Sequence, residues 1–122
     1  MAVVELTQDN FEQTVNESDF VIVDFWAPWC APCRSFAPVY EKVSEDFGDV
    51  VFAKVNTEQE QEIAMHFQIR SIPTLMIFRE KIIIFSQAGA LPEQAFRQLV
   101  ERAKELDMDQ VRAQIEQEKG QQ

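Results

Sequence analysis

The order of apolar and polar residues along the chain predicts five short strands. Apolar runs of strand length are typical of strands that are covered on both faces. The expected strands span residues 3–6, 20–26, 50–55, 74–78 and 82–86. The last two are close enough to form a hairpin, but the connection Arg79-Glu80-Lys81 lacks a common hairpin dipeptide, so the turn type stays open.

Apolar residues three and four positions apart predict helices between these strands. Short helices are expected around residues 11–15 and over 58–67, and an amphipathic helix over 92–103. A longer helix follows the second strand, and its apolar positions are Phe36, Val39, Tyr40, Val43 and Phe47. Pro38 lies inside this helix and is expected to kink it, and Gly48 is placed to terminate it.

Strands that alternate with helices and then end in a hairpin and a last helix predict an α/β fold. We expect a central mixed β-sheet of four to five strands, flanked by helices on both faces. Residues 1–106 are expected to form one domain, and residues 107–122 a polar C-terminal helical extension. Either Asp107 or Asp109 caps a separate helix there, or the preceding helix continues, and fraying is expected around residues 118–120.

Length and charge narrow the class of protein. A chain of 122 residues with 46% apolar residues suits one domain with a proper core. Its net charge of −10 disfavours nucleic-acid binding and attachment to anionic membranes, which need a basic surface. The longest apolar runs are far shorter than the roughly 20 residues that span a bilayer. The first residues lack the features of a signal peptide, so a cytoplasmic location is expected.

The two cysteines, Cys30 and Cys33, allow three interpretations. A zinc site needs four ligands, and His66 is the one further thiolate or imidazole ligand that the chain offers, so no metal is expected. A purely structural disulfide closing so short a loop stabilises a fold weakly. A redox dithiol fits better, because the pair follows a strand and opens a helix.

A redox dithiol in this position has an inherent asymmetry. Cys30 is expected at the first turn of the helix, where main-chain N–H groups and the helix dipole favour the thiolate. Cys33, one turn further on, is expected to be more buried. Cys30 is therefore the expected nucleophile and Cys33 the resolving thiol, while Pro32 suits an early helical position.

Asp24 is the one charged residue in the apolar run 20–26. Alternation along a strand places it with Ile22 and Trp26, on a face that is otherwise covered. Burial raises the pKa of a carboxyl group, and such a group suits a proton acceptor for Cys33. An exposed or edge position of Asp24 is the alternative.

Three motifs together resemble the thioredoxin family. They are Val23-Asp24-Phe25-Trp26-Ala27-Pro28-Trp29-Cys30 with Pro32-Cys33, then Ser71-Ile72-Pro73-Thr74-Leu75, then Gly89-Ala90-Leu91. The resemblance spans about residues 3–103. It implies the thioredoxin fold and a protein-disulfide reductase with a redox-active Cys30–Cys33 disulfide and no bound cofactor. It also implies re-reduction by an NADPH-dependent thioredoxin reductase, and we expect a monomer.

The resemblance also implies roles for residues outside the cysteine pair. Asp24 matches a buried acid of the family, and Lys54 matches a lysine near that acid. Pro73 is expected to be cis, to face the cysteines and to present the backbone of Ile72 to an extended substrate. The remaining expected residues are an exposed rim for substrate (Trp29, Ala88, Gly89 and Ala90) and Trp26, which packs beneath the site.

A binding module without enzymatic activity is the alternative function. The fold would then serve as a scaffold, with the acidic tail 107–122 engaging one partner. The presence of both cysteines, Asp24 and Pro73 argues against it.

Overall fold

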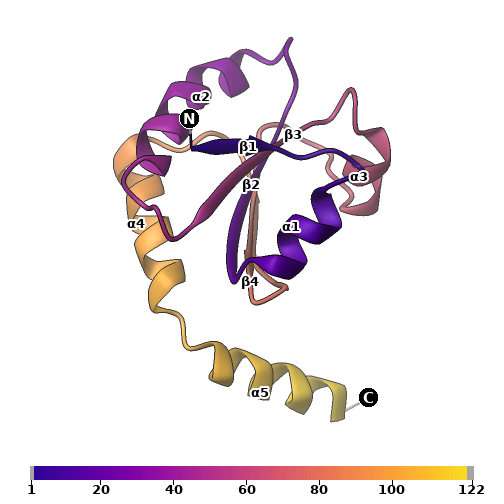
Figure 1. Ribbon diagram of the computed structural model, residues 1–122, viewed down its shortest axis with the longest axis vertical. Coiled ribbons are helices and arrows are strands. Elements are labelled where there is room, and N and C mark those ends of the chain that lie inside the picture. The colour runs from indigo at the N-terminus through magenta and orange to yellow at the C-terminus, as the bar shows by residue number, and fades with distance from the viewer. Residues whose placement is uncertain (1, 121–122) are drawn as a thin grey trace.

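The computed structural model describes residues 2–120, so residue 1 of the expected domain and residues 121–122 of the expected extension lie outside the described part. The elements in chain order are β1 (Val3–Glu5), α1 (Phe11–Glu17), β2 (Phe20–Trp26), α2 (Ala31–Ser44), β3 (Val51–Asn56), α3 (Gln61–His66), β4 (Thr74–Arg79), β5 (Ile82–Ala88), α4 (Glu93–Glu105) and α5 (Met108–Gly120). Figure 1 shows how they are arranged.

The five strands form one mixed sheet in the order β1-β3-β2-β4-β5. β1, β3 and β2 run parallel, whereas β4 is antiparallel to both β2 and β5. Helices α2 and α4 lie on one side of the sheet, and α1 and α3 on the other (Figure 1). The expected mixed sheet with helices on both faces is confirmed.

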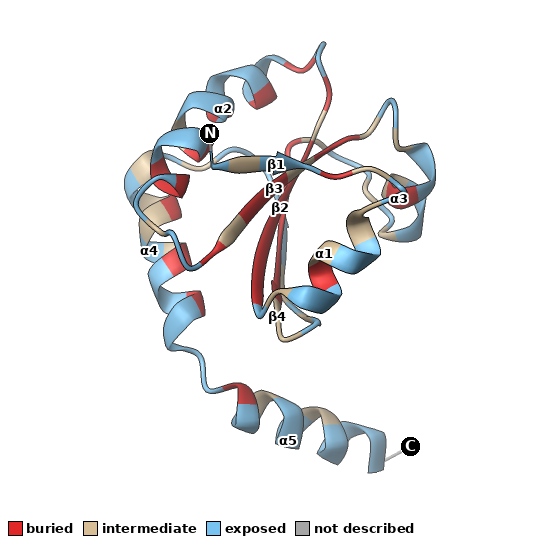
Figure 2. Ribbon diagram, in the orientation of Figure 1, coloured by how far each residue is buried: buried red, intermediate tan, exposed pale blue. Residues whose placement is uncertain are grey.

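Side-chain alternation along β2 divides the core into two layers. Phe20 and Ile22 belong to the cluster that packs against α2 and α4, while Val21, Val23 and Phe25 belong to the cluster beneath α1 and α3. Both clusters are fully or nearly fully buried, as the red central strands in Figure 2 show. Every second residue of β2 therefore points toward α2, the helix that begins at the cysteine pair.

Two predicted helix boundaries are wrong, and local hydrogen bonds explain both. The expected helix over 58–67 begins only at Gln61, because the side-chain oxygen of Asn56 accepts the N–H groups of Glu58 and Gln59 and holds them in a turn. Helix α2 ends at Ser44, where shorter i→i−3 bonds tighten the last turn, and Gly48 lies in the turn that follows.

The C-terminal extension is a separate helix that contacts the β4–β5 hairpin. The carboxylate of Asp107 caps α5 by accepting the N–H groups of Asp109 at 3.0 Å and Gln110 at 3.3 Å. Arg112 pairs with Glu80 in the hairpin turn, where Glu80 and Lys81 both have positive φ, the signature of a type I′ turn. The helix continues through Gly120, and the fraying expected around residues 118–120 stays a prediction.

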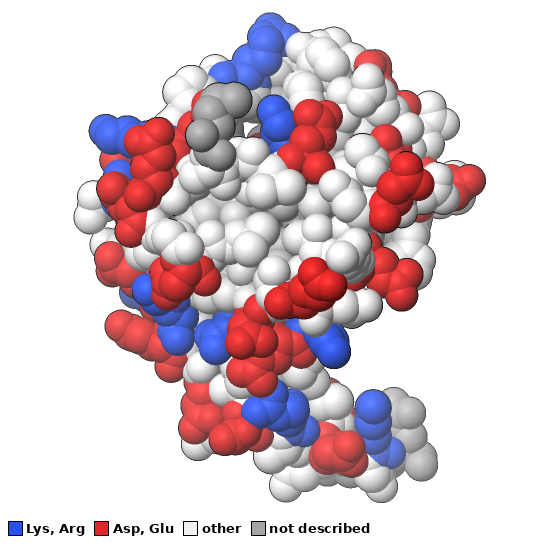
Figure 3. All heavy atoms as spheres, viewed as in Figure 1, with Lys and Arg blue, Asp and Glu red and all other residues white. Residues whose placement is uncertain are grey.

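The surface carries an excess of acidic side chains without a basic patch on the face shown in Figure 3. Lys and Arg side chains are interspersed among the carboxylates there. No helix among residues 2–120 is long and apolar enough to cross a bilayer.

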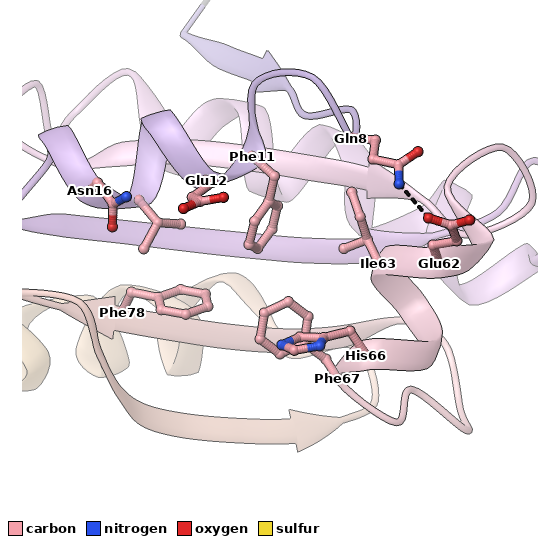
Figure 4. A pocket seen from close by; sticks show the side chains of 10 residues that line it. Gln8, Phe11, Glu12, Asn16, Glu62, Ile63, His66, Phe67 and Phe78 are labelled. Carbon is pink, nitrogen blue, oxygen red and sulfur yellow. Dashed lines mark hydrogen bonds between the residues drawn. The ribbon is translucent and has the colours of Figure 1, made fainter.

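A cavity of about 410 Å³ lies between α1 and α3, away from the cysteine pair. In Figure 4, Phe11 and Glu12 project from α1 on one side, and Phe67, His66 and Phe78 lie on the other. A hydrogen bond between Gln8 and Glu62 closes one end. His66 is exposed at the end of α3.

The turn after α3 leads the chain toward the loop that faces the cysteines. The N–H of Gln68 bonds to Met65 O at 3.0 Å and that of Ile69 to Ala64 O at 2.9 Å. This pair of bonds is a Schellman motif, which places Gln68 in the left-handed region with φ 54°. Glycine is the usual residue there because a Cβ atom is disfavoured at such φ.

We expect Gln68→Gly to raise the free energy of unfolding by about 0.5–1 kcal/mol, because it removes that Cβ. Urea denaturation of the oxidised protein measures the change. The matched control is Gln98→Gly, at an exposed position inside α4, which should lower stability by about 1 kcal/mol. A loss of stability in both variants would contradict the prediction.

Candidate active site

The cysteine pair lies at the N-terminus of α2, as the sequence predicts. Cys30 is the N-cap residue, and its Sγ accepts the N–H of Cys33 at 3.2 Å. The two residues form a disulfide, with their Cα atoms 5.2 Å apart. Pro32 occupies the second helical position, so its missing N–H leaves no hydrogen bond unmade. The first turn of α2 therefore directs a main-chain donor at the sulfur of Cys30.

The Ile72-Pro73 loop closes over this sulfur. Its peptide bond is cis, and the carbonyl oxygen of Ile72 lies 3.7 Å from Cys30 Sγ. The N–H of Gly89 donates to the carbonyl of Pro73 at 2.8 Å, which joins the end of β5 to the same loop. Gly89 has φ 108°, a conformation that a residue with a side chain rarely adopts.

Asp24 is buried beneath the pair. It is 4% exposed, and it lies opposite Lys54 in the parallel register of β2 and β3. Asp24, Cys33, Trp26 and Lys54 line one cavity of about 140 Å³. Burial raises the pKa of Asp24 to about 7, and the positive charge of Lys54 lowers it by less.

Comparison with known proteins identifies the family. The thioredoxin family model matches residues 2–102. Thioredoxin 2 of Streptomyces coelicolor is 52% identical over 97% of this chain and 88% of its own length, and thioredoxin 1 of a Nostoc species is 42% identical over 83% and 96%. A solved thioredoxin of Plasmodium falciparum matches with TM-score 0.76 and 33% identity over 81% of this chain and 97% of that chain. The chain belongs to the thioredoxin family.

This membership makes the chain a thiol-disulfide oxidoreductase that reduces protein disulfides. The match to the Streptomyces thioredoxin extends beyond the family model into the C-terminal extension, because it covers 118 residues. The thioredoxin fold is likewise shared with a solved thioredoxin mutant of Halobacterium salinarum, with TM-score 0.79 and 29% identity over 86% of this chain and 93% of that chain.

The expected substrate rim is exposed around the thioredoxin disulfide. Trp29 is 66% exposed, and Ala88, Gly89 and Ala90 are exposed at the end of β5. Trp26 and Ile72 are half-buried and pack against the two cysteines. Cys33 is 2% exposed and Cys30 4%, so the expected order holds, although the difference is small in the disulfide form.

Lys54 and Pro38 are two further residues expected near the cysteine pair. The ammonium group of Lys54 lies over the ring of Trp26, 5.2 Å from its centroid, an arrangement that favours a cation. Pro38 lies inside α2, which continues without a break from Ala31 to Ser44. The kink at Pro38 therefore stays a prediction. No cluster of three or more His, Cys, Asp or Glu side chains suited to a metal occurs among residues 2–120.

Tyr40 is the residue near the site that the sequence pattern did not single out. Its helical spacing assigns it only to the apolar face of α2, yet it also lines the cavity of Asp24 and Cys33. The chemistry of the side chain could have indicated it. Tyr40 is the one tyrosine of the chain, and a tyrosine hydroxyl on a buried helix face needs a hydrogen-bond partner.

The raised pKa of Asp24 predicts a pH-dependent stability. Between pH 4 and pH 7 the folded protein keeps a proton that the unfolded chain releases, so the free energy of unfolding falls as the pH rises. Asp24→Asn removes this loss. Urea denaturation of the oxidised proteins measures the free energy of unfolding of each. The difference between variant and wild type should change by about 2–3 kcal/mol in favour of the variant from pH 5 to pH 8.

The control is Asp49→Asn. Asp49 is exposed, and its hydrogen bond with Lys104 lowers the pKa of its carboxyl group. It is therefore ionised in both the folded and the unfolded chain from pH 5 to pH 8, and its variant should show no such divergence. Equal pH dependence of Asp24→Asn and the wild type would show that Asp24 titrates as an ordinary carboxyl group.

Proposed function

We propose that this thioredoxin-family protein reduces substrate disulfides with Cys30 as the nucleophile and Cys33 as the resolving thiol. The observation that carries these roles is the 3.2 Å contact between the N–H of Cys33 and Cys30 Sγ at the N-cap of α2. That donor and the positive end of the helix favour a thiolate on Cys30 over a neutral thiol. Cys33 lies inside the first turn and has no equivalent cap position.

The reaction needs only the two thiols and the substrate disulfide. The thiolate of Cys30 attacks one substrate sulfur, a mixed disulfide forms, and the other substrate sulfur leaves as a thiolate. Cys33 then loses its proton and attacks the sulfur of Cys30. The second substrate sulfur leaves, and two electrons have passed from the dithiol to the substrate as the Cys30–Cys33 disulfide forms.

Asp24 is the proposed acceptor of the proton from Cys33. The two side chains line the same cavity, and a carboxyl group with a pKa of about 7 can both accept and release a proton at neutral pH. Lys54, opposite Asp24 in the register, counters part of the pKa rise that burial causes. Its proposed role is to keep Asp24 ionised often enough to act.

The substrate lies across an apolar rim in this proposal. The exposed ring of Trp29 supplies one side, and Ala88, Gly89 and Ala90 supply the other. The backbone of Ile72, beside Cys30 Sγ, pairs with an extended substrate segment. Such main-chain recognition needs little of the substrate sequence, which suits a general reductase.

The proposed cellular setting follows from the family. The protein works in the cytoplasm as a monomer, holds no bound cofactor and is re-reduced by an NADPH-dependent thioredoxin reductase. Residues 1–106 form the catalytic domain, and 107–122 form an extension. The turn before α2 and helix α5 lie at opposite ends of the molecule in Figure 1, which supports catalysis without participation of the extension.

Substitution of the two cysteines tests the assigned roles. Cys33→Ser keeps the nucleophile but cannot resolve the mixed disulfide, so the reduced variant should accumulate a covalent complex when it attacks the disulfides of insulin. Cys30→Ser should accumulate none and should lose insulin reduction. Non-reducing gel electrophoresis, with release of the complex by dithiothreitol, measures both results. Equal capture by the two variants would contradict the assignment.

The same capture assay tests the docking alternative. A Cys33→Ser chain that ends at Leu106 lacks α5 but keeps the cysteine turn and the rim. It should capture insulin as fast as the full-length variant does. A loss of capture on truncation, with the domain still folded by circular dichroism, would favour a binding role for the extension.

A further inference from the structure

A single hydroxyl group links α2 to the neighbouring strands β2 and β3. Tyr40 is buried, and its hydroxyl oxygen lies 2.9 Å from the carbonyl oxygen of Ile22 on β2 and 2.7 Å from that of Ala53 on β3. The two carbonyl oxygens are both acceptors, so they share the single proton of the Tyr40 hydroxyl group. Burial and the nearby charge of Asp24 raise the pKa of Tyr40, and the hydroxyl therefore stays a donor at neutral pH.

The two carbonyl groups belong to residues next to the proposed acid and its lysine. Ile22 is two positions before Asp24 and points to the same side of β2, and Ala53 directly precedes Lys54. The hydroxyl of Tyr40 thus contacts both strands just before they present these side chains to the cavity. Tyr40 lines that cavity as well.

On the helix, Tyr40 lies on the same face as Cys33. The two are seven residues apart, which is close to two helical turns. Pro38 lies between them and cannot donate the i→i−4 hydrogen bond. The contact of Tyr40 with the strands therefore fixes α2 two residues after Pro38.

We propose that Tyr40 is a positioning residue for the resolving step. Its hydroxyl holds α2 against β2 and β3 and so fixes the separation of Cys33 from Asp24 across their shared cavity. This inference rests on the proposed role of Asp24 as the proton acceptor for Cys33. It does not involve the attack by Cys30, which depends on the N–H that Cys33 donates to its sulfur and not on the distance to Asp24.

The ring of Tyr40 has a separate function in packing. It stacks on Phe96 with the centroids 5.5 Å apart and meets Phe52 edge-on at 5.5 Å. Phenylalanine keeps this ring, so Tyr40→Phe removes the hydroxyl group and little else. The substitution separates positioning by the hydroxyl from filling of the core.

The experiment uses the reduced full-length protein and Ellman's reagent in a stopped-flow instrument. Attack by Cys30 releases one thionitrobenzoate at a rate that depends on reagent concentration, and attack by Cys33 releases the second in a step that does not. We expect Tyr40→Phe to slow the second phase about fivefold and to leave the first unchanged. In an Asp24→Asn background, Tyr40→Phe should slow the second phase by less than about twofold.

The rate of the second phase is also measured as a function of pH, because a change in core packing alone would not alter the shape of this profile. The groups that face or share the cavity of Asp24 are Cys33, Arg34, Tyr40 and Glu41 on α2 and Lys54 on β3. The wild type should show an inflection near pH 7 from Asp24. Tyr40→Phe should diminish the amplitude of this inflection, because Cys33 then reacts with less help from Asp24.

Ser44→Ala is the matched control. Ser44 is buried near the end of the same helix, and its hydroxyl donates to the carbonyl of Glu41 within α2 at 2.6 Å. Its loss removes a buried hydroxyl that joins no strand to the helix. Both phases should keep the wild-type rates, and thermal unfolding checks that each variant is folded.

Three results would overturn the inference, and the third would also overturn the proposed role of Asp24. An unchanged second phase in Tyr40→Phe removes the positioning role. An equal slowing with and without Asp24 shows that Tyr40 acts independently of the acid. If Asp24→Asn alone leaves the second phase and its pH profile unchanged, the proposed role of Asp24 fails, and that failure is distinct from the first two.

Discussion

The N–H groups in the first turn of α2 have no carbonyl partners within the helix, and the chemistry of the site depends on this unmet hydrogen-bonding capacity. Cys30 occupies the N-cap position, where serine, threonine or aspartate usually satisfies such a donor. A sulfur atom in that position accepts the N–H of Cys33. A thiolate gains more from the donor than a thiol does, so the fold itself favours the reactive form.

Backbone atoms surround the sulfur of Cys30 on one side of the pair, and a buried acid lies on the other. The Ile72-Pro73 loop and Gly89 are joined by a main-chain hydrogen bond and border the sulfur of Cys30 with backbone atoms. Beneath the pair, Asp24 is buried at an energetic cost that appears as its raised pKa. Stability is thus lower at neutral pH than it would be with a neutral residue there, a cost that the proposed proton transfer to Asp24 would explain.

Much of this arrangement could be predicted from the sequence because its signals are local. The run from Phe20 to Trp26 is apolar on both faces, and its predicted bounds equal those of β2. The cysteine spacing before a helical pattern placed Cys30 at a helix start. The start of α3 was missed, since a side-chain oxygen of Asn56 competes for the N–H groups that a helix would use. The hydroxyl of Tyr40 was missed because its partners are carbonyl groups far away in the sequence.

The claim that the helix N-terminus activates Cys30 can be measured directly. Thiolate absorbance near 240 nm, followed as a function of pH in the reduced protein, reports the titration of the two thiols, and Cys33→Ser isolates that of Cys30. The account predicts a pKa for Cys30 well below the value of about 8.5 for a free cysteine. A pKa at or above that value would contradict it.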